Sequence, residues 1–227
     1  MINISIEKHL GKYISKEWML ILKTYATHQS LKKNERILNE GAKVDAVYFI
    51  NTGKVKIVSH FDKVNERLLR LSASGDLVGH RAISSSTYPI SAIALTDTEV
   101  IRIPIEIFQN LIRANPDFAI YVIDFLANDL KSTEERMKSM IHSEVTVRIA
   151  MIICMLVDAF GYDKEDSKKL NYTLPRADMA SFAGTTYESV IRSLAKLEEM
   201  KIIQLDNKSL YLLKEKELRK LITKNLF

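Results

Sequence analysis

Cysteine is almost absent from this chain, which has only Cys154 among its 227 residues. One thiol cannot form a disulfide within the chain, and it cannot supply the thiolates of an all-cysteine metal cluster. Cys154 stands inside the apolar run Ile149–Val157, where a lone cysteine usually serves as a small core residue. This cysteine usage is typical of a reducing compartment.

Long uncharged hydrophobic runs are absent as well. The apolar run Ile149–Val157 has about half of the ~20 residues that a membrane-spanning helix needs. The N-terminal stretch MINISIEKHL is too charged, and its apolar part too short, for a secretory signal peptide. The sequence therefore predicts a soluble, cytoplasmic protein with no membrane partner.

Motifs of catalysis and metal binding are also lacking. The sequence has no nucleophile–base pairing, no metal-ligand spacing and no phosphate-cradling glycine loop of the Walker type. The histidines show no ligand spacing with one another; they are His9, His28, His60, His80 and His142. The sequence predicts neither an enzyme nor a metal site.

Positive charge is in only slight excess, with a net charge of +5. Residues 1–142 hold 19 basic and 16 acidic residues, and residues 143–227 hold 14 and 12, so neither part is markedly basic. Charge alone favours a polyanionic partner weakly and does not locate its site. Hydrophobic residues make up 47% of the chain, which is enough for a substantial core.

The stretch Leu174–Ile203 has the pattern of a helix-turn-helix. Pro175 suits the start of a short helix over Arg176–Ala183, because a first helical residue needs no N–H. Gly184 suits a sharp turn, and a second helix is predicted to run to about Met200. The apolar residues of that second helix recur at helical spacing and should point inward; they are Val190, Leu194 and Leu197.

The first turn of the second helix has more than one interpretation. Thr185 or Thr186 could cap it, and Thr185 with Glu188 has capping-box spacing, in which Glu188 only satisfies backbone donors. Glu188 and Arg192 could also form an exposed ion pair. Alternatively, these two side chains and Lys196 line an outer face that reads bases in the major groove of DNA.

The period of the hydrophobic pattern changes along the rest of the chain. Residues 5–29 are predicted to be an amphipathic helix with Ile14, Trp18, Leu22 and Tyr25 on one side. The region from 30 to 104 breaks into short runs rich in Val, Ile, Tyr and Thr with glycine turns between them. Such runs are typical of a sandwich, barrel or roll.

Helical spacing returns after Pro104. Helices are predicted over 105–113, 117–142, 145–160 and 214–227, with a short strand over 170–174 and a hairpin of 202–205 with 209–213. The helix over 117–142 carries a near-heptad apolar stripe; it includes Ile123, Leu126, Leu130, Met137 and Met140. The stripe suits a partner helix, and the alternative is that it packs on its own β-domain.

Two sequence stretches resemble a cyclic-nucleotide-binding-type β-roll. They are Ile37–Gly41 with Val47–Gly53, and Gly75–Ile83 with Pro89–Ala92. With the long helix and the helix-turn-helix, the order resembles the CRP/FNR family of bacterial transcription regulators over about residues 10–213. The resemblance implies an α+β fold with a double-stranded, jelly-roll-like β-roll at 1–116, a dimerisation helix at 117–142, and a winged helix-turn-helix at 143–227.

The resemblance also implies partners: double-stranded DNA bearing a near-palindromic operator, a second copy of the chain, and RNA polymerase. In the family, a glutamate and an arginine four residues apart read base pairs, and Glu188 and Arg192 match them. Tyr187 stands where the family often has arginine or valine. Positions that hold phosphate match Arg176, Thr186, Ser189 and Lys208. The alternative is a ligand-binding sensor module whose DNA-binding domain is weak or vestigial.

An effector pocket is implied as well, and its positions match Gly79, His80, Arg81, Ile90, Ser91, Ala92 and Thr133. His80 and Ile90 stand where the cyclic-nucleotide branch has its ribose-binding glutamate and phosphate-binding arginine. This disfavours cyclic AMP, because isoleucine cannot neutralise a phosphate. The N-terminal cysteines of the oxygen-sensing branch are missing, which excludes its iron–sulfur cluster, and haem is disfavoured for want of a cysteine near Gly79. The effector, operator, target genes and sign of regulation stay open.

Overall fold

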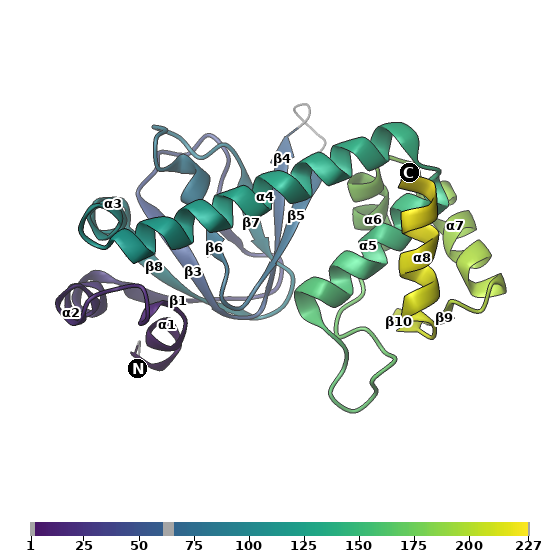
Figure 1. Ribbon diagram of the computed structural model, residues 1–227, viewed down its shortest axis with the longest axis horizontal. Coiled ribbons are helices and arrows are strands. Elements are labelled where there is room, and N and C mark those ends of the chain that lie inside the picture. Colours follow the sequence, from purple (N-terminus) through teal and green to yellow (C-terminus); the bar gives the residue numbers. More distant parts are fainter. Residues whose placement is uncertain (1–2, 61–65, 227) are drawn as a thin grey trace. The chain divides into compact units, whose positions relative to one another are not determined.

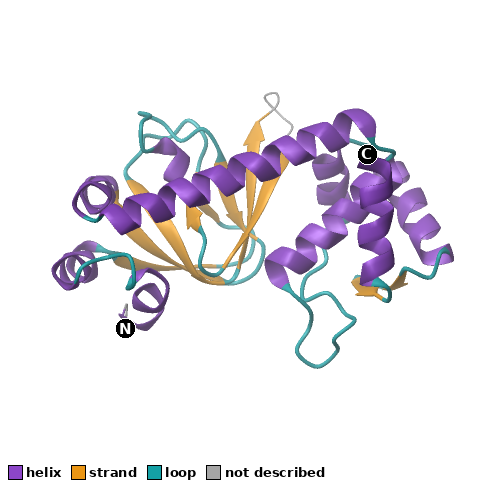
Figure 2. Cartoon of the chain, viewed as in Figure 1, coloured by secondary structure: helices purple, strands orange, loops and turns teal. Residues whose placement is uncertain are grey.

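The computed structural model describes residues 3–60 and 66–226. Internal contacts divide the chain into two compact units, Met1–Lys131 and Ser132–Phe227, and the division falls inside the long helix α4 (Pro116–His142). Figures 1 and 2 show that the first unit holds two β-sheets, whereas the second is mainly helical. Among the described residues, no helix is both long and apolar enough to span a membrane.

Two antiparallel four-stranded sheets form the body of the first unit. One has the order β1-β8-β3-β6, with β1 at Thr27–Leu31, β8 at Thr98–Pro104, β3 at Ala46–Thr52 and β6 at Leu77–Val78. The other has the order β2-β7-β4-β5, with β2 at Arg36–Leu38, β7 at Ser91–Ala94, β4 at Lys54–His60 and β5 at Glu66–Ala73. The expected β-roll is therefore confirmed.

Strand β3 shows how the alternation of its side chains builds two cores. Ala46, Tyr48 and Ile50 join a cluster with residues of both sheets, such as Val55 and Ala92. The intervening Val47 and Phe49 face the other way and join a cluster with residues of the helices. Because successive side chains of a strand point to opposite faces, this one strand is buried on both sides.

The helices of the first unit are α1 (Asn3–Leu10), α2 (Lys16–Tyr25), the 3-10 helix His80–Ala82, α3 (Ile105–Ala114) and the start of α4. The prediction of one helix over 5–29 is wrong in two respects. The helix breaks after Leu10, and α2 begins anew where the Ser15 hydroxyl accepts from Trp18 N at 3.3 Å. The end of the predicted helix is strand β1, which pairs with β8 from Thr27↔Arg102 to Leu31↔Thr98.

The burial of the predicted apolar side of that segment also differs from expectation. Ile14 and Leu22 are buried, whereas Tyr25 is 56% exposed. Tyr25 is the last residue of α2, and the chain then turns into β1, so the helical period no longer applies beyond it. A pairing strand about 70 residues away along the chain thus outweighs the local helical pattern.

Helix α4 has two apolar faces. Phe118 and Val122 are buried in the helix-side core of the first unit, with Tyr121 and Phe125 packed against it. The near-heptad stripe lies on another face and is exposed: Ile123 is 61% exposed, Leu126 37%, Leu130 60% and Met137 56%. The interpretation that the stripe packs on its own β-domain is therefore wrong for these four residues. Met140 differs, because it is half-buried within the second unit.

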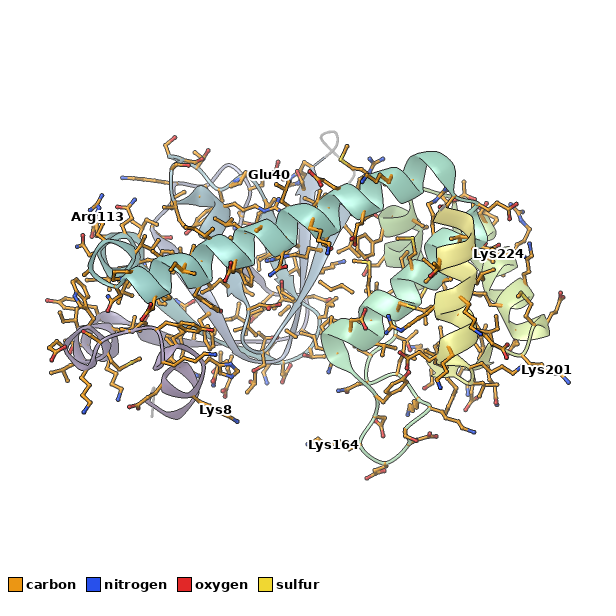
Figure 3. All side chains as sticks on the ribbon, in the orientation of Figure 1. Lys8, Glu40, Arg113, Lys164, Lys201 and Lys224 are labelled. Atoms are coloured by element: carbon orange, nitrogen blue, oxygen red, sulfur yellow. The ribbon has the colours of Figure 1, made fainter. Side chains whose placement is uncertain are left out.

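The second unit is built on α5 (Val145–Phe160), which has the predicted bounds and contacts α6 (Arg176–Ala183), α7 (Tyr187–Glu199) and α8 (Glu215–Leu226). Strands β9 (Ile203–Asp206) and β10 (Ser209–Leu212) form the predicted hairpin. Burial in α5 raises the pKa of Cys154 to about 11, as expected of an unreactive core thiol. Lys164 marks the exposed loop after α5 (Figure 3).

The short strand predicted over 170–174 does not form. Leu170 makes an isolated bridge with Tyr162 and donates its N–H to Leu210 O at 2.9 Å, and Lys169 makes another bridge with Tyr211. Further along, the Thr173 hydroxyl accepts from Leu210 N at 3.2 Å, so a side chain takes the place of a backbone ladder partner.

Candidate functional site

The turn between α6 and α7 requires its glycine. Gly184 has φ +60° and ψ 49°, the left-handed conformation that ends α6. A Cβ at this position would lie 2.6 Å from Met140 Cε, the end of a flexible side chain that could move aside, so the positive φ is the main reason for glycine here. Gly184 thus sets the geometry with which α7 follows α6.

Thr186, and not Thr185, caps α7. Its backbone is extended, and its hydroxyl accepts from Ser189 N at 3.3 Å. Ser189 therefore holds the third helical position, and the capping box of Thr185 with Glu188 does not form. Glu188 lies one residue earlier, fully exposed in the first turn, and its own backbone N–H and Thr186 lower the pKa of its carboxyl.

Helix α7 separates an inner from an outer face. Val190, Leu194 and Leu197 are buried as predicted. Tyr187 is 51% exposed, and Glu188 and Arg192 are exposed beside it. Arg192 Nη2 donates to Ser189 Oγ at 2.9 Å, so the guanidinium is held by a neutral hydroxyl and keeps its remaining donors.

The other residues predicted to contact DNA belong to the same unit. Arg176 is the first residue of α6, is half-buried, and interacts electrostatically with Tyr187. Lys208 is exposed in the turn between β9 and β10. The described part of the chain thus presents one hydroxyl-rich, mixed-charge helix end with basic side chains on flanking elements.

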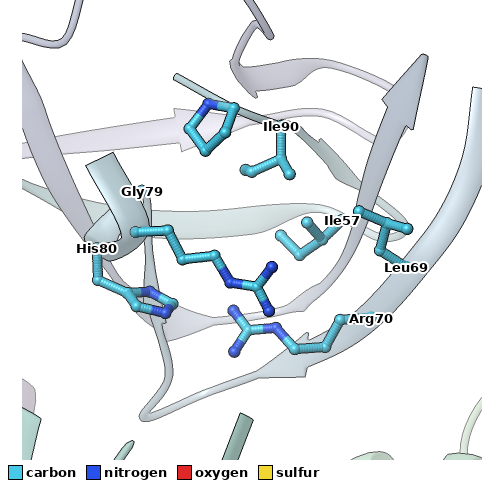
Figure 4. Close-up of a pocket in the computed structure, with 8 residues that line it drawn as sticks. Ile57, Leu69, Arg70, Gly79, His80 and Ile90 are labelled. Carbon is cyan, nitrogen blue, oxygen red and sulfur yellow. The ribbon is translucent and has the colours of Figure 1, made fainter. Parts of the chain in front are cut away.

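The first unit contains a small cavity at the predicted effector site (Figure 4). Ile57, Leu69, Arg70, Gly79, His80, Arg81, Pro89 and Ile90 line it. The free space among them is about 20 Å³. Pockets for cofactors and drug-sized ligands usually measure about 300 Å³ or more, so this one is nearly filled by its own side chains.

Four of the predicted effector residues line the cavity: Gly79, His80, Arg81 and Ile90. Ser91 and Ala92 lie on β7 and are buried elsewhere. The Ser91 hydroxyl accepts from Glu40 N at 2.9 Å, and Ala92 belongs to the core between the sheets. Thr133 belongs to the second unit.

Gly79 and His80 are placed by the turn that follows β6. Gly79 has φ +84°, and a Cβ there would approach Leu38 Cδ2 and Tyr88 Cε1 to 3.2 Å. His80 Nδ1 donates to Leu77 O at 3.0 Å, and the ring meets Phe125 of α4 edge-on at 4.8 Å between centroids. These contacts hold the imidazole in a buried position, 2% exposed.

A buried carboxylate that sequence reasoning missed completes this site. Asp129 of α4 accepts from Arg81 Nε at 2.9 Å and from Arg81 Nη2 at 2.5 Å, both at Oδ2. Arg70 Nη1 lies 3.5 Å from Asp129 Oδ1, and His80 Nε2 lies 3.8 Å from Oδ2. Figure 4 shows Arg70 reaching from β5 toward His80.

The charges of this group support one another. Burial opposes the charge on Asp129, but the guanidinium groups of Arg70 and Arg81 outweigh it and hold the pKa of its carboxyl well below the ordinary value. Burial, together with the two arginines, lowers the pKa of His80, so its ring is neutral near pH 7. The group therefore contains two guanidinium ions and the Asp129 carboxylate, and the largely buried carboxyl group of Asp76 interacts electrostatically with Arg70 and His80.

One signal in the sequence could have identified Asp129. It follows Phe118, Val122 and Phe125 at helical spacing, so a charged residue occupies a position of the buried face. Among the described residues, no group of three or more His, Cys, Asp or Glu side chains could hold a metal ion.

Comparisons with known proteins agree with this architecture. The family model for the cyclic nucleotide-binding domain matches residues 28–115, and the model for the Crp-like helix-turn-helix domain matches residues 147–221. Together they span more than two thirds of the chain.

Related proteins and structures cover most of the chain. The fumarate and nitrate reduction regulatory protein of Vibrio cholerae is 24% identical over 84% of this chain and 76% of its own. The transcriptional activator protein Anr of Pseudomonas protegens is 23% identical over 81% of this chain and 75% of its own.

Solved structures share the fold. FixK2 from Bradyrhizobium japonicum has a TM-score of 0.76 at 21% identity, covering 86% of this chain and 96% of its own. A mutant of CooA from Carboxydothermus hydrogenoformans has a TM-score of 0.75 at 20% identity, covering 98% and 97%. The chain belongs to the CRP/FNR family of transcription regulators, with a cyclic nucleotide-binding-type domain followed by a Crp-like DNA-binding domain.

Proposed function

We propose that the chain works in the cytoplasm as a homodimer that reads a near-palindromic operator and acts on RNA polymerase. In this proposal residues 1–116 are the sensor, 117–142 the dimer helix, and 143–227 the winged helix-turn-helix. The observation that carries it is the N-terminal end of α7, where Glu188 and Arg192 are exposed while the opposite face is buried.

The chemistry of that helix end suits base recognition. A glutamate can accept from cytosine N4, and an arginine can donate two hydrogen bonds to guanine O6 and N7. Arg192 is bound to the neutral Ser189 hydroxyl and not to a carboxylate, so it can turn to a base at little cost. Tyr187 contributes an exposed ring and hydroxyl at the start of the same helix, where it would help to select the outer bases.

Phosphate contacts would fix the register of the helix on the duplex. The proposed donors are Arg176, Thr186, Ser189 and Lys208, which are supplied by α6, the cap of α7 and the hairpin turn. Such contacts strengthen binding without reading sequence. The effect of salt on affinity would therefore come mainly from Arg176 and Lys208.

Dimerisation would use the exposed stripe of α4. The stripe residues Ile123, Leu126, Leu130 and Met137 follow a heptad-like spacing and are more than a third exposed in the single chain, and Met140 would extend the stripe. Large apolar side chains at such spacing usually pack against a second helix. A two-fold axis along α4 would present two copies of α7 to successive half-sites of about 10 base pairs' separation.

The sensor role rests on the cavity in the roll. Gly79, His80, Arg81 and Ile90 line it, and Ser91, Ala92 and Thr133 would complete the family's effector site. The small free volume disfavours cyclic AMP in this conformation. The function as proposed requires neither haem nor an iron–sulfur cluster, because the one cysteine of the chain, Cys154, is buried in α5.

The test is selection of bound sequences from random double-stranded oligonucleotides by the purified full chain. We expect enrichment of two inverted half-sites about one helical turn apart. Folded protein that enriches no sequence would overturn the proposal and favour the alternative, a ligand-binding sensor module with a weak or vestigial DNA-binding domain. Enrichment of a single, unrepeated half-site would overturn the dimer.

A further inference from the structure

We propose that the roll contains an oxyanion site made by Arg70 and Arg81, and that Asp129 of α4 is its resident ligand. The carboxylate takes the place that a phosphate or carboxylate of a small molecule would otherwise occupy. The inference deepens the proposed sensor role and rests on it for its biological meaning, but its chemistry is confined to residues of the first unit.

The geometry is that of a bound anion. Two nitrogens of Arg81 converge on Asp129 Oδ2 at 2.9 and 2.5 Å, and Arg70 Nη1 approaches Oδ1 at 3.5 Å. Guanidinium groups are the usual partners of carboxylates and phosphates because their donors form a planar fork. The two arginines come from β5 and the 3-10 helix, and Arg70 Nη2 also donates to Leu77 O at 3.2 Å, a contact that does not depend on the carboxylate.

The burial of Asp129 sets it apart from the surface ion pairs. Its side chain is 5% exposed, whereas those of Glu7, Asp97 and Glu217 are 54%, 67% and 54% exposed. A charged pair in such a position is costly to desolvate, and an apolar side chain would extend the Phe118–Phe125 face of α4 more cheaply. This cost favours a role for the charge beyond holding the helix in place.

The cavity beside the arginines indicates how large an anion the site could hold. Arg70 and Arg81 both line it, together with His80 and Ile90, and about 20 Å³ is free. Removal of the Asp129 side chain would add room for a small oxyanion directly against the two guanidinium groups. His80 is neutral, with Nε2 3.8 Å from the carboxylate, and adds no negative charge. Asp76 interacts electrostatically with Arg70 and remains a competing carboxyl group, so Arg81 is the main donor to an incoming anion.

The experiment compares anion binding to the full chain and to two variants, Asp129→Ala and Asp129→Asn, by calorimetry at constant ionic strength. The probes are inorganic phosphate, acetate and cyclic AMP. We expect no saturable binding by the parent chain. Asp129→Ala should bind phosphate or acetate saturably, with an affinity at least about tenfold above the detection limit of the measurement on the parent chain, which is the size of one charge-assisted hydrogen bond. If the double variant Asp129→Ala/Arg81→Ala no longer binds the anion, the Arg81 guanidinium is the group that binds it.

Asp45→Ala is the matched control. Asp45 accepts from Arg102 at 2.7 Å in the same unit, but its side chain is 54% exposed, so the variant frees an arginine without opening this site. It should gain no saturable phosphate binding. Asp129→Asn removes the charge but keeps the side-chain volume, so it should gain less anion binding than Asp129→Ala. Asp129→Ser, which also opens the site, replaces the alanine variant if that variant does not fold.

Two outcomes would overturn the inference: parent and Asp129 variants that bind the probes equally, or a gain that survives the loss of Arg81. Operator binding is measured separately. A chain that gains phosphate binding but selects no DNA sequence would overturn the proposed function and leave the oxyanion site intact.

Discussion

Helix α7 and the β-roll each contain an arginine at a proposed binding site, and the two arginines differ in the partner that they already bind. On α7, Arg192 is exposed, donates to the Ser189 hydroxyl, and interacts electrostatically with the exposed Glu188. In the roll, Arg81 is bound through two nitrogens to the buried carboxylate of Asp129. A guanidinium held by a neutral hydroxyl exchanges that partner for a base easily, whereas one held by a desolvated carboxylate does not. The comparison separates a site open to an external ligand from one that the chain fills itself.

The largest expected effect comes from removing the Asp129 carboxylate, which fills the arginine site in the roll. Asp129→Ala should lower the free energy of unfolding of the first unit by about 3 kcal/mol, at the lower end of the range for breaking a buried ion pair. The lower end applies because Arg81 is 38% exposed and can be hydrated in the variant. Urea unfolding measures this loss. Asp45→Ala should lower the free energy of unfolding by about 1 kcal/mol or less. Equal losses in the two variants would contradict the distinction between the buried and the exposed carboxylate.

Acid should remove much of the same stabilisation. The pKa of Asp129 is lowered in the folded chain, so below the ordinary aspartate range of about 3.9 the unfolded chain binds a proton that the folded chain does not. Stability from this group is therefore complete above that range, begins to fall as the pH drops through it, and is fully lost only below the lower pKa of the folded chain. Unfolding measured between pH 6 and 3 should be less pH-dependent in Asp129→Ala than in the parent chain, and parallel profiles would contradict this.

The exposed site on α7 is tested by how well the chain discriminates between DNA sequences. Arg192→Ala should reduce discrimination between the selected operator and a mismatched one by about 1–3 kcal/mol, while sequence-independent binding changes little. Competition binding measures both. Arg113→Ala is the control, because Arg113 is an exposed arginine on α3 of the other unit (Figure 3). Unchanged discrimination in Arg192→Ala would assign base reading to other residues.

The smallest expected effect is on stability and concerns Thr186, the N-cap of α7. Thr186→Ala should destabilise the second unit by about 1 kcal/mol, because Ser189 N loses its hydroxyl acceptor. Thr185→Ala should have a much smaller effect, since Thr185 is not the cap. Thermal unfolding of the two variants compares them directly, and a larger loss in Thr185→Ala would restore the capping box with Glu188.

The helix-turn-helix could be predicted closely from local sequence. Pro175 and Gly184 bound α6 in the structure as they do in the pattern, and the inward residues of α7 are the predicted ones. Proline at a helix start and glycine at a helix end act through backbone geometry that needs no distant partner. The choice between Thr185 and Thr186 was beyond such reasoning, because both are suitable cap residues one position apart.

The N-terminal region was harder to predict, for a physical reason. Residues after Tyr25 continue a helical pattern, yet Thr27–Leu31 pairs with Thr98–Arg102 far along the chain. Backbone hydrogen bonds to a distant strand are worth more than the weak local preference. The stripe of α4 was predicted correctly as a stripe, but its exposure depended on which helical face the roll covers.

By itself the sequence determined the apolar stripe of α4 and the two helices of the DNA-binding unit, because both follow from local periodicity and backbone preference, whereas the order of the domains followed from the resemblance to a family. Only the tertiary structure decided which arginine is exposed on α7 and which is held by a buried carboxylate. Arg81 and Asp129 are separated by 48 residues, and Arg70 joins them from another strand. Their charges interact because folding removes them from water and brings them within hydrogen-bonding distance or close to it, and no local pattern encodes that proximity.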